Sequence, residues 1–466
     1  MDTIWLPDLT QSAGPKFQAL SQALRGAIKS GMLAPGTRLP PVRELAFQAG
    51  VTPGTVSRAY QIATQEGLLS ATVGRGTFVT AAKPRLGPTQ PLFMERSRAL
   101  EPGVVDLRAP LVPDVGQAAA IGDVFGGIAA NMGADWLDYP SQRDEVPLRS
   151  AVCDWMADRV LGSFGPDDIT LTNGGQNGIT LILMCCLRGD RPVVLTEELA
   201  YPGFRHAARL VRADVVGVEM DAEGIVPEAL EAACRRHGPQ VLCLTVEAQN
   251  PTAVRMGLER RLQIVEIARK FDLQIIEDDC YSIPGPAWPT VRALAPERTW
   301  FVGSLSKTVS AALRFGYILC PTGMGAPGRL TAQHSFFGLS RPLAELVLHL
   351  FASGKAADLR RAVQMELSDR SQRVVNHLGT HDIGWQKGLP FVWIKLPSGW
   401  RASTFARTAE AAGVLVRSAD EYALIHGRAP HAVRLAINGL IPIEHLEQAA
   451  DTLALLLHSP PGDLCV

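Results

Sequence analysis

Lys307 stands in a run of small and hydroxyl-bearing residues, Gly303–Thr308 (GSLSKT), with Arg314 seven positions further on. A lysine amine forms an imine with an aldehyde, and the hydroxyls of Ser304 and Ser306 can donate to phosphate oxygens. The Arg314 guanidinium can pair with phosphate charge. These residue types at this spacing suit a covalently held aldehyde that carries a phosphate group. The plain alternative for Lys307 alone is a surface lysine.

Two further segments present groups that such a molecule would need. The strand-like run 273–277 leads directly into Asp278, and open α/β sheets present ligand groups at the carboxyl ends of their strands. The segment 173–178 (NGGQNG) precedes an apolar helical run. Its small residues, among them Gly175 beside Gln176, expose backbone N–H groups at a helix N-terminus, where an anion is favoured.

The elements that must position these groups follow an α/β pattern. From about residue 105 onward, short β-branched runs alternate with helical patterns, which predicts a mainly parallel sheet. The predicted strands include Val193–Thr196, Val215–Val218, Val241–Val246 and Leu273–Glu277. We expect this body to span residues 105–460, with a small C-terminal α+β part from about residue 360.

A separate compact pattern occupies residues 14–80. Apolar residues at helical spacing predict three helices, the first ending at Gly31, with Thr52 placed to cap the third. The strand-like runs Leu68–Ser70 and Thr77–Val79 then flank a glycine-rich turn, as in a hairpin. Three helices followed by a β-wing form a winged helix-turn-helix, which is an α+β arrangement.

The length and the charge distribution favour a multidomain chain with a DNA-binding end. A chain of 466 residues predicts two or three domains. Residues 1–80 carry seven basic and four acidic side chains, a net charge of +3, which leaves −4 for the remainder because the whole chain carries −1. A basic head on an acidic body favours a nucleic-acid contact at the N-terminus. Residues 81–104, rich in proline and arginine, predict a linker.

The cysteines and the apolar segments argue against several other classes of protein. The eight cysteines show no spacing typical of zinc ligands, so we expect neither a metal site nor disulfides. The N-terminus lacks the pattern of a signal peptide, and no apolar run reaches membrane-spanning length. The expected location is the cytoplasm.

Three motifs follow one another in the head: 36–46 (GTRLPPVRELA), 55–60 (TVSRAY) and 74–79 (GRGTFV). Their order and spacing, over about 65 residues, resemble the GntR family of winged helix-turn-helix regulators. The resemblance implies that the third helix enters the major groove of an operator and that the wing reaches the minor groove. The residues expected to contact DNA are Arg38, Arg43, Thr52, Thr55, Arg58 and Arg75.

The body carries four ordered motifs: 173–178 (NGGQNG), 249–252 (QNPT), 278–281 (DDCY) and 303–308 (GSLSKT). Together they resemble the fold-type I pyridoxal phosphate enzymes, specifically the aspartate aminotransferase-like group. The resemblance implies an α/β fold-type I domain with pyridoxal 5'-phosphate as its cofactor, held by Lys307 through an aldimine.

The resemblance also implies a role for each matching residue. Asp278 would pair with the nitrogen of the cofactor ring, with Asp279 as the alternative. Asn250 and Tyr281 would contact the phenolic oxygen, and Tyr201 would lie over the ring. The phosphate would be held by Gly175, Gln176, Ser304, Ser306, Arg314 and, across a dimer interface, Tyr139. Arg434 would bind an acid group of the ligand, for which a bidentate guanidinium is suited.

A GntR-type head followed by such a body resembles the MocR subgroup of GntR regulators over the whole chain. The resemblance implies a head-to-tail homodimer that binds a double-stranded DNA operator and senses an amine or amino-acid effector by aldimine exchange at Lys307. Two alternatives stay open: an active aminotransferase with an autoregulatory head, and a sensor of pyridoxal phosphate itself. The pocket residues do not separate a regulator from an enzyme, because both need the same chemistry.

Overall fold

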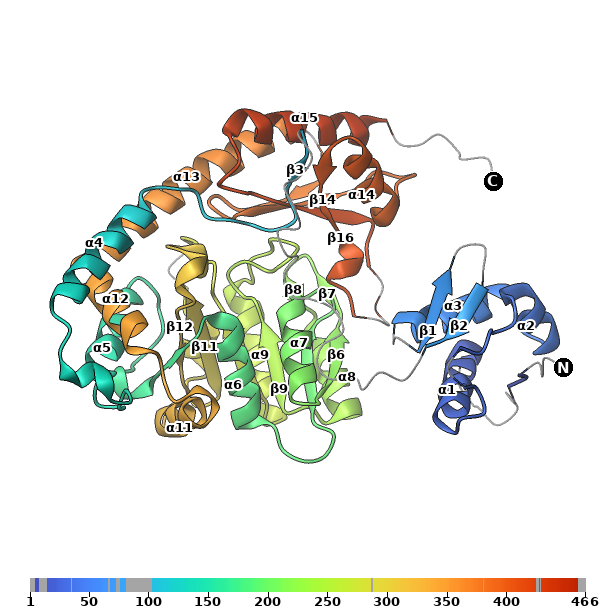
Figure 1. Cartoon of the computed structure of the whole chain (residues 1–466), viewed down its shortest axis with the longest axis horizontal. Helices are drawn as coiled ribbons and strands as arrows, with labels where there is room; N and C mark the ends of the chain where they lie inside the picture. The colour runs from blue at the N-terminus through green and yellow to red at the C-terminus, as the bar shows by residue number, and fades with distance from the viewer. Residues whose placement is uncertain are drawn as a thin grey trace. The chain divides into compact units, whose positions relative to one another are not determined.

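The computed structural model describes residues 5–7, 15–34, 36–65, 68–72, 76–80, 103–285, 288–379, 381–424, 427 and 429–459. The chain divides into two compact units, residues 1–90 and 91–466 (Figure 1). Most of the predicted linker 81–104 lies outside the described residues, so the predicted domain boundaries stay a prediction. Within the ranges given above, no helix is both long and apolar enough to cross a lipid bilayer.

The first unit contains three helices and an antiparallel hairpin, as its sequence predicts. These elements are α1 (Lys16–Lys29), α2 (Val42–Gln48), α3 (Pro53–Gln65), β1 (Leu69–Thr72) and β2 (Gly76–Val79). The apolar faces of the three helices form the core, since Leu20, Leu45 and Val56 are fully buried. This arrangement is a winged helix-turn-helix. The turn between the two strands, which includes Arg75, lies outside the described residues.

The second unit is built around a seven-stranded sheet of order β4-β12-β11-β10-β9-β5-β6. Its strands are β4 (Ile169–Thr172), β5 (Val193–Glu197), β6 (Asp214–Val218), β9 (Val241–Leu244), β10 (Gln274–Asp278), β11 (Thr299–Ser304) and β12 (Gly316–Leu319). Strands β6, β5, β9, β10 and β11 are parallel, and β12 runs antiparallel to both of its neighbours. The prediction of a mainly parallel sheet is confirmed, with strand ends that differ by up to two residues.

Helices cover both faces of this sheet (Figure 1). One face packs against α6 (Gly175–Cys186), α7 (Pro202–Leu210) and α11 (Gly325–Phe336). The other face packs against α8 (Pro227–His237), α9 (Leu258–Lys270) and α10 (Val291–Leu294). The short hairpin of β7 (Met220–Asp221) and β8 (Gly224–Ile225) precedes α8. Because both faces are covered, β9 and β11 are buried along their whole length, as expected for strands of an α/β domain.

Two further groups of elements complete the second unit. Beside the β4–β12 edge, an apolar cluster joins α4 (Gln117–Ala130), α5 (Val146–Trp155) and α12 (Arg341–Ala352). The C-terminal part has an antiparallel sheet of β13 (Ile383–Gly384), β14 (Phe391–Lys395), β17 (Ala432–Ala436) and β16 (Arg417–Ser418). It packs against α13 (Lys355–Leu378), α14 (Ala402–Ala411) and α15 (Ile443–His458). Strand β3 (Val105–Asp106) pairs with β15 (Val414–Leu415), so the start of the body packs against its end.

The parallel strands bring chain-distant polar residues to one edge of the large sheet. Glu197, Asp278 and Ser304 are the last residues of β5, β10 and β11, and parallel strands present their carboxyl ends on the same side. This edge is where open α/β sheets place ligand groups. The predicted cofactor residues around Lys307 lie at the same edge.

Candidate functional site

Lys307 lies in a single helical turn, η3 (Leu305–Lys307), directly after β11. The Ser304 hydroxyl accepts a hydrogen bond from the Ser306 N–H at 3.1 Å and so fixes the start of this turn. The Lys307 Nζ donates to the Pro110 carbonyl at 3.0 Å. Removal from water and the nearby charge of Arg434 lower the pKa of Lys307 to about 8. Roughly a tenth of such an amine is neutral at pH 7, and the neutral form attacks aldehydes.

Hydroxyl and guanidinium donors meet beside this lysine. The Ser304 and Ser306 hydroxyls lie 3.0 Å apart, and Arg314 Nη1 donates to the Ser306 hydroxyl at 3.3 Å. Arg314 Nη2 donates to the Asn173 carbonyl at 3.3 Å. A Cβ on Gly174 would lie 2.5 Å from Arg314 Nη2, so glycine is required for the guanidinium to come this close. The structure therefore brings together three of the six residues predicted to hold the phosphate.

The N-terminus of α6 lies at the same place. Gly174 precedes the helix with φ 86°, and no side chain caps its first turn, so the amides of Gly175 and Gln176 remain available to an anion. A Cβ on Gly175 would lie 2.5 Å from Cys280 Sγ. Gln176 Nε2 donates to the Gly203 carbonyl at 2.9 Å, while its buried Oε1 has no partner within the described residues. These donors form a cradle of the kind that phosphate groups occupy.

Tyr201 borders this cradle at the start of α7. Its ring meets the Phe204 ring edge to face, with centroids 5.9 Å apart. A Cβ on Gly203 would lie 2.1 Å from the Tyr201 ring, so the absence of a side chain there allows the ring its position. Burial raises the pKa of the Tyr201 hydroxyl above its usual range, which keeps the hydroxyl protonated.

The two neighbouring acids, Asp278 and Asp279, differ in their partners. Asp278 Oδ1 accepts from the Cys280 N–H at 3.0 Å, and no ion pair within the described ranges includes Asp278. Burial raises its pKa. Asp279, in contrast, accepts from Arg159 Nε at 3.0 Å, although burial still raises its pKa to about 7. A cation placed at this edge of the sheet would therefore find Asp278 without a basic partner and Asp279 already paired.

Asn250, Tyr281 and Arg434 form a hydrogen-bonded chain. Asn250 Nδ2 donates to the Tyr281 hydroxyl at 3.3 Å, and Arg434 Nη1 donates to Asn250 Oδ1 at 2.8 Å. Arg434 lies in β17, with its guanidinium carbon 5.2 Å from the centroid of the Phe391 ring. Ala253, directly after the QNPT motif, adopts φ 64° and so takes the left-handed conformation that glycine would adopt more readily.

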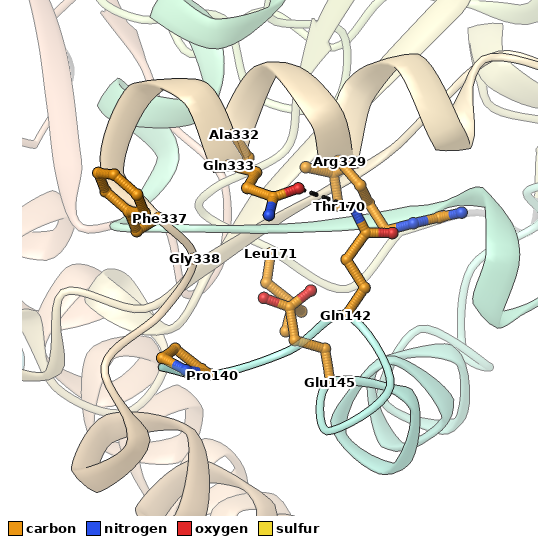
Figure 2. Close-up of a pocket in the computed structure, with 10 residues that line it drawn as sticks. All are labelled: Pro140, Gln142, Glu145, Thr170, Leu171, Arg329, Ala332, Gln333, Phe337 and Gly338. Atoms are coloured by element: carbon orange, nitrogen blue, oxygen red, sulfur yellow. Dashed lines mark hydrogen bonds between the residues drawn. The ribbon is translucent and has the colours of Figure 1, made fainter. Parts of the chain in front are cut away.

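Tyr139 does not join this cluster. Its side chain is 78% exposed, and its ring contacts Phe337, with centroids 5.9 Å apart. A small pocket lies next to it, between the 140–145 segment, β4 and α11 (Figure 2). Gln142 Nε2 donates to Gln333 Oε1 there at 3.2 Å, and the Glu145 side chain points into the pocket (Figure 2). This pocket contains none of the predicted site residues.

Two residues outside the predicted set, Gln249 and Glu197, hold the turn that contains Asn250. Gln249 Oε1 accepts from the Thr252 N–H at 2.9 Å, and Gln249 Nε2 donates to Glu197 Oε2 at 3.1 Å. Glu197 is buried at the end of β5, where burial raises its pKa to about 8. The strand-end rule that identified Asp278 would also have found Glu197, whereas Gln249 was visible only as part of the QNPT motif.

The predicted DNA contacts of the head lie on its surface. Thr52 accepts from the Thr55 N–H at 3.3 Å and so caps α3, as the sequence predicts. The Arg58 guanidinium stacks over the Phe17 ring, 4.2 Å from its centroid. Arg58 and Thr52 are exposed, and Thr55 is half-buried.

Two other arginines of the head are also exposed. Arg43 lies on α2, and Arg38 lies beside the wing. A Cβ on Gly76 would lie 2.9 Å from Arg38 Nε, so the wing glycine leaves room for this side chain. Arg75 falls outside the described residues. The described DNA candidates thus remain accessible to a ligand, and their contacts with DNA stay a prediction.

Two family models match the chain. The model for aminotransferase class I and II matches residues 104–453, and the model for bacterial regulatory proteins of the gntR family matches residues 17–79. The first match includes the residues around Lys307 in the body, and the second includes the winged helix-turn-helix of the head.

Individual relatives share one or both parts. The HTH-type transcriptional regulator YdeF of Bacillus subtilis is 28% identical, over 97% of this chain and 96% of that protein. The HTH-type pyridoxine biosynthesis transcriptional regulator PdxR of Corynebacterium glutamicum is 29% identical, over 77% of this chain and 76% of its own length. The crystal structure of an archaeal alanine:glyoxylate aminotransferase matches with a TM-score of 0.67 and 23% identity, over 76% of this chain and 91% of its own.

Proposed function

Because the chain belongs to the aminotransferase class I and II family and carries a GntR-type DNA-binding domain, as MocR-like regulators of the GntR family do, we propose that it senses an amine effector at Lys307. The observation that carries this proposal is the combination of a lysine whose pKa is lowered to about 8 with a winged helix-turn-helix in the same chain. The general function, that of a DNA-binding regulator fused to an aminotransferase-like domain, follows from the two families that the chain matches.

Pyridoxal 5'-phosphate is the cofactor of this family, and the residues of the cluster fit it. When bound, it supplies an aldehyde carbon whose double bond to one amine nitrogen can be exchanged for a double bond to another, with a proton passing to the amine released. The donors at Gly175, Gln176, Ser304, Ser306 and Arg314 would hold its phosphate.

Other residues would orient the ring and the effector. The lack of a basic partner supports Asp278 over Asp279 as the acid beside the ring nitrogen. Asn250 and Tyr281 would contact the phenolic oxygen, and Tyr201 would lie over the ring. Arg434 would bind an acid group on the effector, because a guanidinium suits a carboxylate.

The segment that follows the predicted linker provides a route from the cluster toward the head. The Pro110 carbonyl accepts from Lys307, and the Arg108 carbonyl accepts from Arg434 Nη2 at 3.0 Å. An effector that binds Arg434 competes with the Arg108 carbonyl, and an effector that displaces Lys307 from the cofactor frees this amine to donate to the Pro110 carbonyl. A ligand shifts an equilibrium only through contacts that differ between two states, and these two contacts are such a difference.

We also propose that the protein acts as a head-to-tail homodimer. Tyr139, 78% exposed and outside the cluster of its own chain, is then free to reach the phosphate of a partner subunit. Sedimentation of the protein as a dimer would support this assembly, and a monomer that still binds cofactor and operator would contradict it.

Two other functions have specific support. The predicted cofactor residues that meet around Lys307 are compatible with an active aminotransferase with an autoregulatory head. The similarity to PdxR, named for pyridoxine biosynthesis, favours a sensor of pyridoxal phosphate itself.

One experiment separates the three functions. The affinity for DNA fragments flanking the gene is measured by fluorescence anisotropy with apo protein, with cofactor-loaded protein, and with loaded protein plus an amine library. A sensor of amines changes affinity only when cofactor and a particular amine are both present. A change with cofactor alone indicates a cofactor sensor, and sustained keto-acid formation from an amino acid indicates an enzyme.

A further inference from the structure

Tyr422 is held rigidly beside the predicted cofactor residues around Lys307. Three consecutive backbone carbonyls around it accept hydrogen bonds from the large-sheet part of the body. Arg205 donates to the Glu421 carbonyl at 2.7 Å and to the Ala423 carbonyl at 2.8 Å, and the Ala200 N–H donates to the Tyr422 carbonyl at 3.1 Å. The backbone of Tyr422 is therefore fixed next to the strand end that leads into Tyr201.

The Tyr422 side chain is also confined. The ring meets the Trp393 ring edge to face, with centroids 6.5 Å apart, and the guanidinium carbon of Arg434 lies 5.0 Å from the Tyr422 centroid. Only 2% of Tyr422 is exposed. Burial raises the pKa of Tyr422 to about 12, so the hydroxyl keeps its proton and can donate it to an acceptor.

Two buried donors at this place have no partner. Within the part of the chain that the structure describes, neither the Tyr422 hydroxyl nor Arg434 Nε makes a hydrogen bond. A buried donor without an acceptor destabilises the fold, and such groups are rare in proteins. Two of them in contacting residues, both held in position, indicate an acceptor that the ligand supplies.

The charges around Arg434 limit how many acid groups that ligand carries. Three other guanidiniums lie at this end of the site. Two of them have a carboxylate partner, and the third, Arg205, donates to two backbone carbonyls. Arg108 forms a bidentate pair with Asp106, with both distances 2.8 Å, and Arg417 pairs with Glu421. Arg434 donates only to an amide oxygen and a backbone carbonyl. Among these four guanidiniums, only Arg434 keeps a buried N–H without a partner in the described residues, so this end of the site offers one place for a carboxylate.

We propose that the Tyr422 hydroxyl and Arg434 Nε together bind the single carboxylate of the effector, which is a small amine with one acid group. Tyr422 is then a binding residue that no family motif in the sequence assigned. The proposal rests on the proposed function, because the amine end of the same molecule must reach Lys307.

The test compares ligands with and without the acid group. Cofactor-loaded protein is titrated with ω-amino acids of three to five carbons and with n-alkylamines of the same lengths, following cofactor absorbance. Tyr422→Phe should raise the Kd of the best amino acid about ten- to a hundredfold and leave the Kd of the alkylamines within about twofold. Aspartate and glutamate should bind more weakly than the best monoacid. Tyr60→Phe, which removes a hydroxyl bonded to the Pro40 carbonyl in the head core, is the matched control and should change neither series.

Each outcome decides one claim. An equal loss for amino acids and alkylamines would show that the Tyr422 hydroxyl acts only on the structure of the pocket, and no loss for either would remove it from the site. Tighter binding of aspartate than of any monoacid would contradict the claim that the effector has a single acid group. If the unaltered protein responds to no amine in either series, the effector class proposed here is wrong, and if it responds to no amine in the wider library, the proposed function itself fails.

Discussion

The predicted site residues of the head and of the body are held in different ways. In the head, Arg58 is an exposed side chain supported by one local contact with Phe17, and Arg43 is exposed on the neighbouring helix. In the body, Arg434, Asn250 and Tyr281 are hydrogen-bonded to one another across up to 184 residues of sequence. Separate exposed contacts add their free energies, whereas groups in one buried network depend on each other. We therefore expect graded effects from the head and cooperative effects from the body.

The largest expected effect concerns the two acids of the body. Asp278→Asn should weaken cofactor binding on the order of a hundredfold, because it removes the carboxylate that would face the ring cation. Asp279→Asn should instead lower the free energy of unfolding by about 3 kcal/mol, because it leaves Arg159 buried without its partner. Spectral titration with pyridoxal phosphate and urea denaturation measure the two quantities.

These two variants are controls for each other. A greater loss of cofactor affinity in Asp279→Asn than in Asp278→Asn would reverse the assignment of the ring acid and would place the predicted alternative in the site.

A second difference between the units is their response to pH. Lys307 reacts as the neutral amine, and its pKa is lowered to about 8. The rate of cofactor incorporation into apo protein should therefore rise about tenfold per pH unit below pH 8 and level off above it, as measured by stopped-flow absorbance. Operator binding through the predicted arginines would rely on guanidinium groups that stay charged in this range, so it should show no step near pH 8. A flat incorporation rate from pH 6 to 9 would contradict the role of the Lys307 amine.

The additivity expected of the head can be measured with two arginines. Arg58→Ala should weaken operator binding by about 1 kcal/mol and reduce the dependence of log K on log salt by about one. Arg43→Ala should have a similar effect, and the double variant should equal the sum within about 0.5 kcal/mol. Fluorescence anisotropy over a range of salt concentrations gives both numbers. An unchanged salt slope in Arg58→Ala would remove this arginine from the DNA interface.

The smallest expected effect is on backbone strain beside Asn250. Ala253→Gly should raise the free energy of unfolding by about 0.5 kcal/mol, because the left-handed conformation at φ 64° suits glycine better than alanine. Ala248, buried in the same apolar cluster, has no positive φ and provides the matched control. Ala248→Gly should lower stability by about 1 kcal/mol. Urea denaturation with an unchanged m-value measures the free energy of unfolding of both variants. An equal loss of stability in Ala253→Gly and Ala248→Gly would show that backbone strain at Ala253 does not decide the result.

Local patterns in the sequence predicted much of the fold. Helical spacing and capping residues predicted the three helices of the head, and Thr52 caps α3 as expected. Alternating β-branched runs predicted β5, β6, β9 and β10. These features depend on residues within one element and its neighbours, so they can be read from a short window of sequence.

The place of Tyr422 beside Arg434 could not be predicted in the same way. The unpaired Tyr422 hydroxyl depends on Arg205, Ala200 and Trp393, which come from different parts of the chain, and no spacing rule joins them. The pairing of Asp279 with Arg159 is also a tertiary contact, and it separates two acids that the sequence left as alternatives. Roles that need a bound ligand or a second subunit, such as that of Tyr139, stay predictions.

The central claim is that amine chemistry at Lys307 controls DNA binding by the head. The most direct measurement is the operator Kd of Lys307→Ala and of the unaltered protein, both cofactor-loaded, with and without a saturating amine that the unaltered protein recognises. The unaltered protein should change its operator Kd at least about fivefold, as coupling of about 1 kcal/mol or more requires. Lys307→Ala should bind the operator with a Kd that the amine leaves unchanged. An amine response of the same size in Lys307→Ala would contradict the claim.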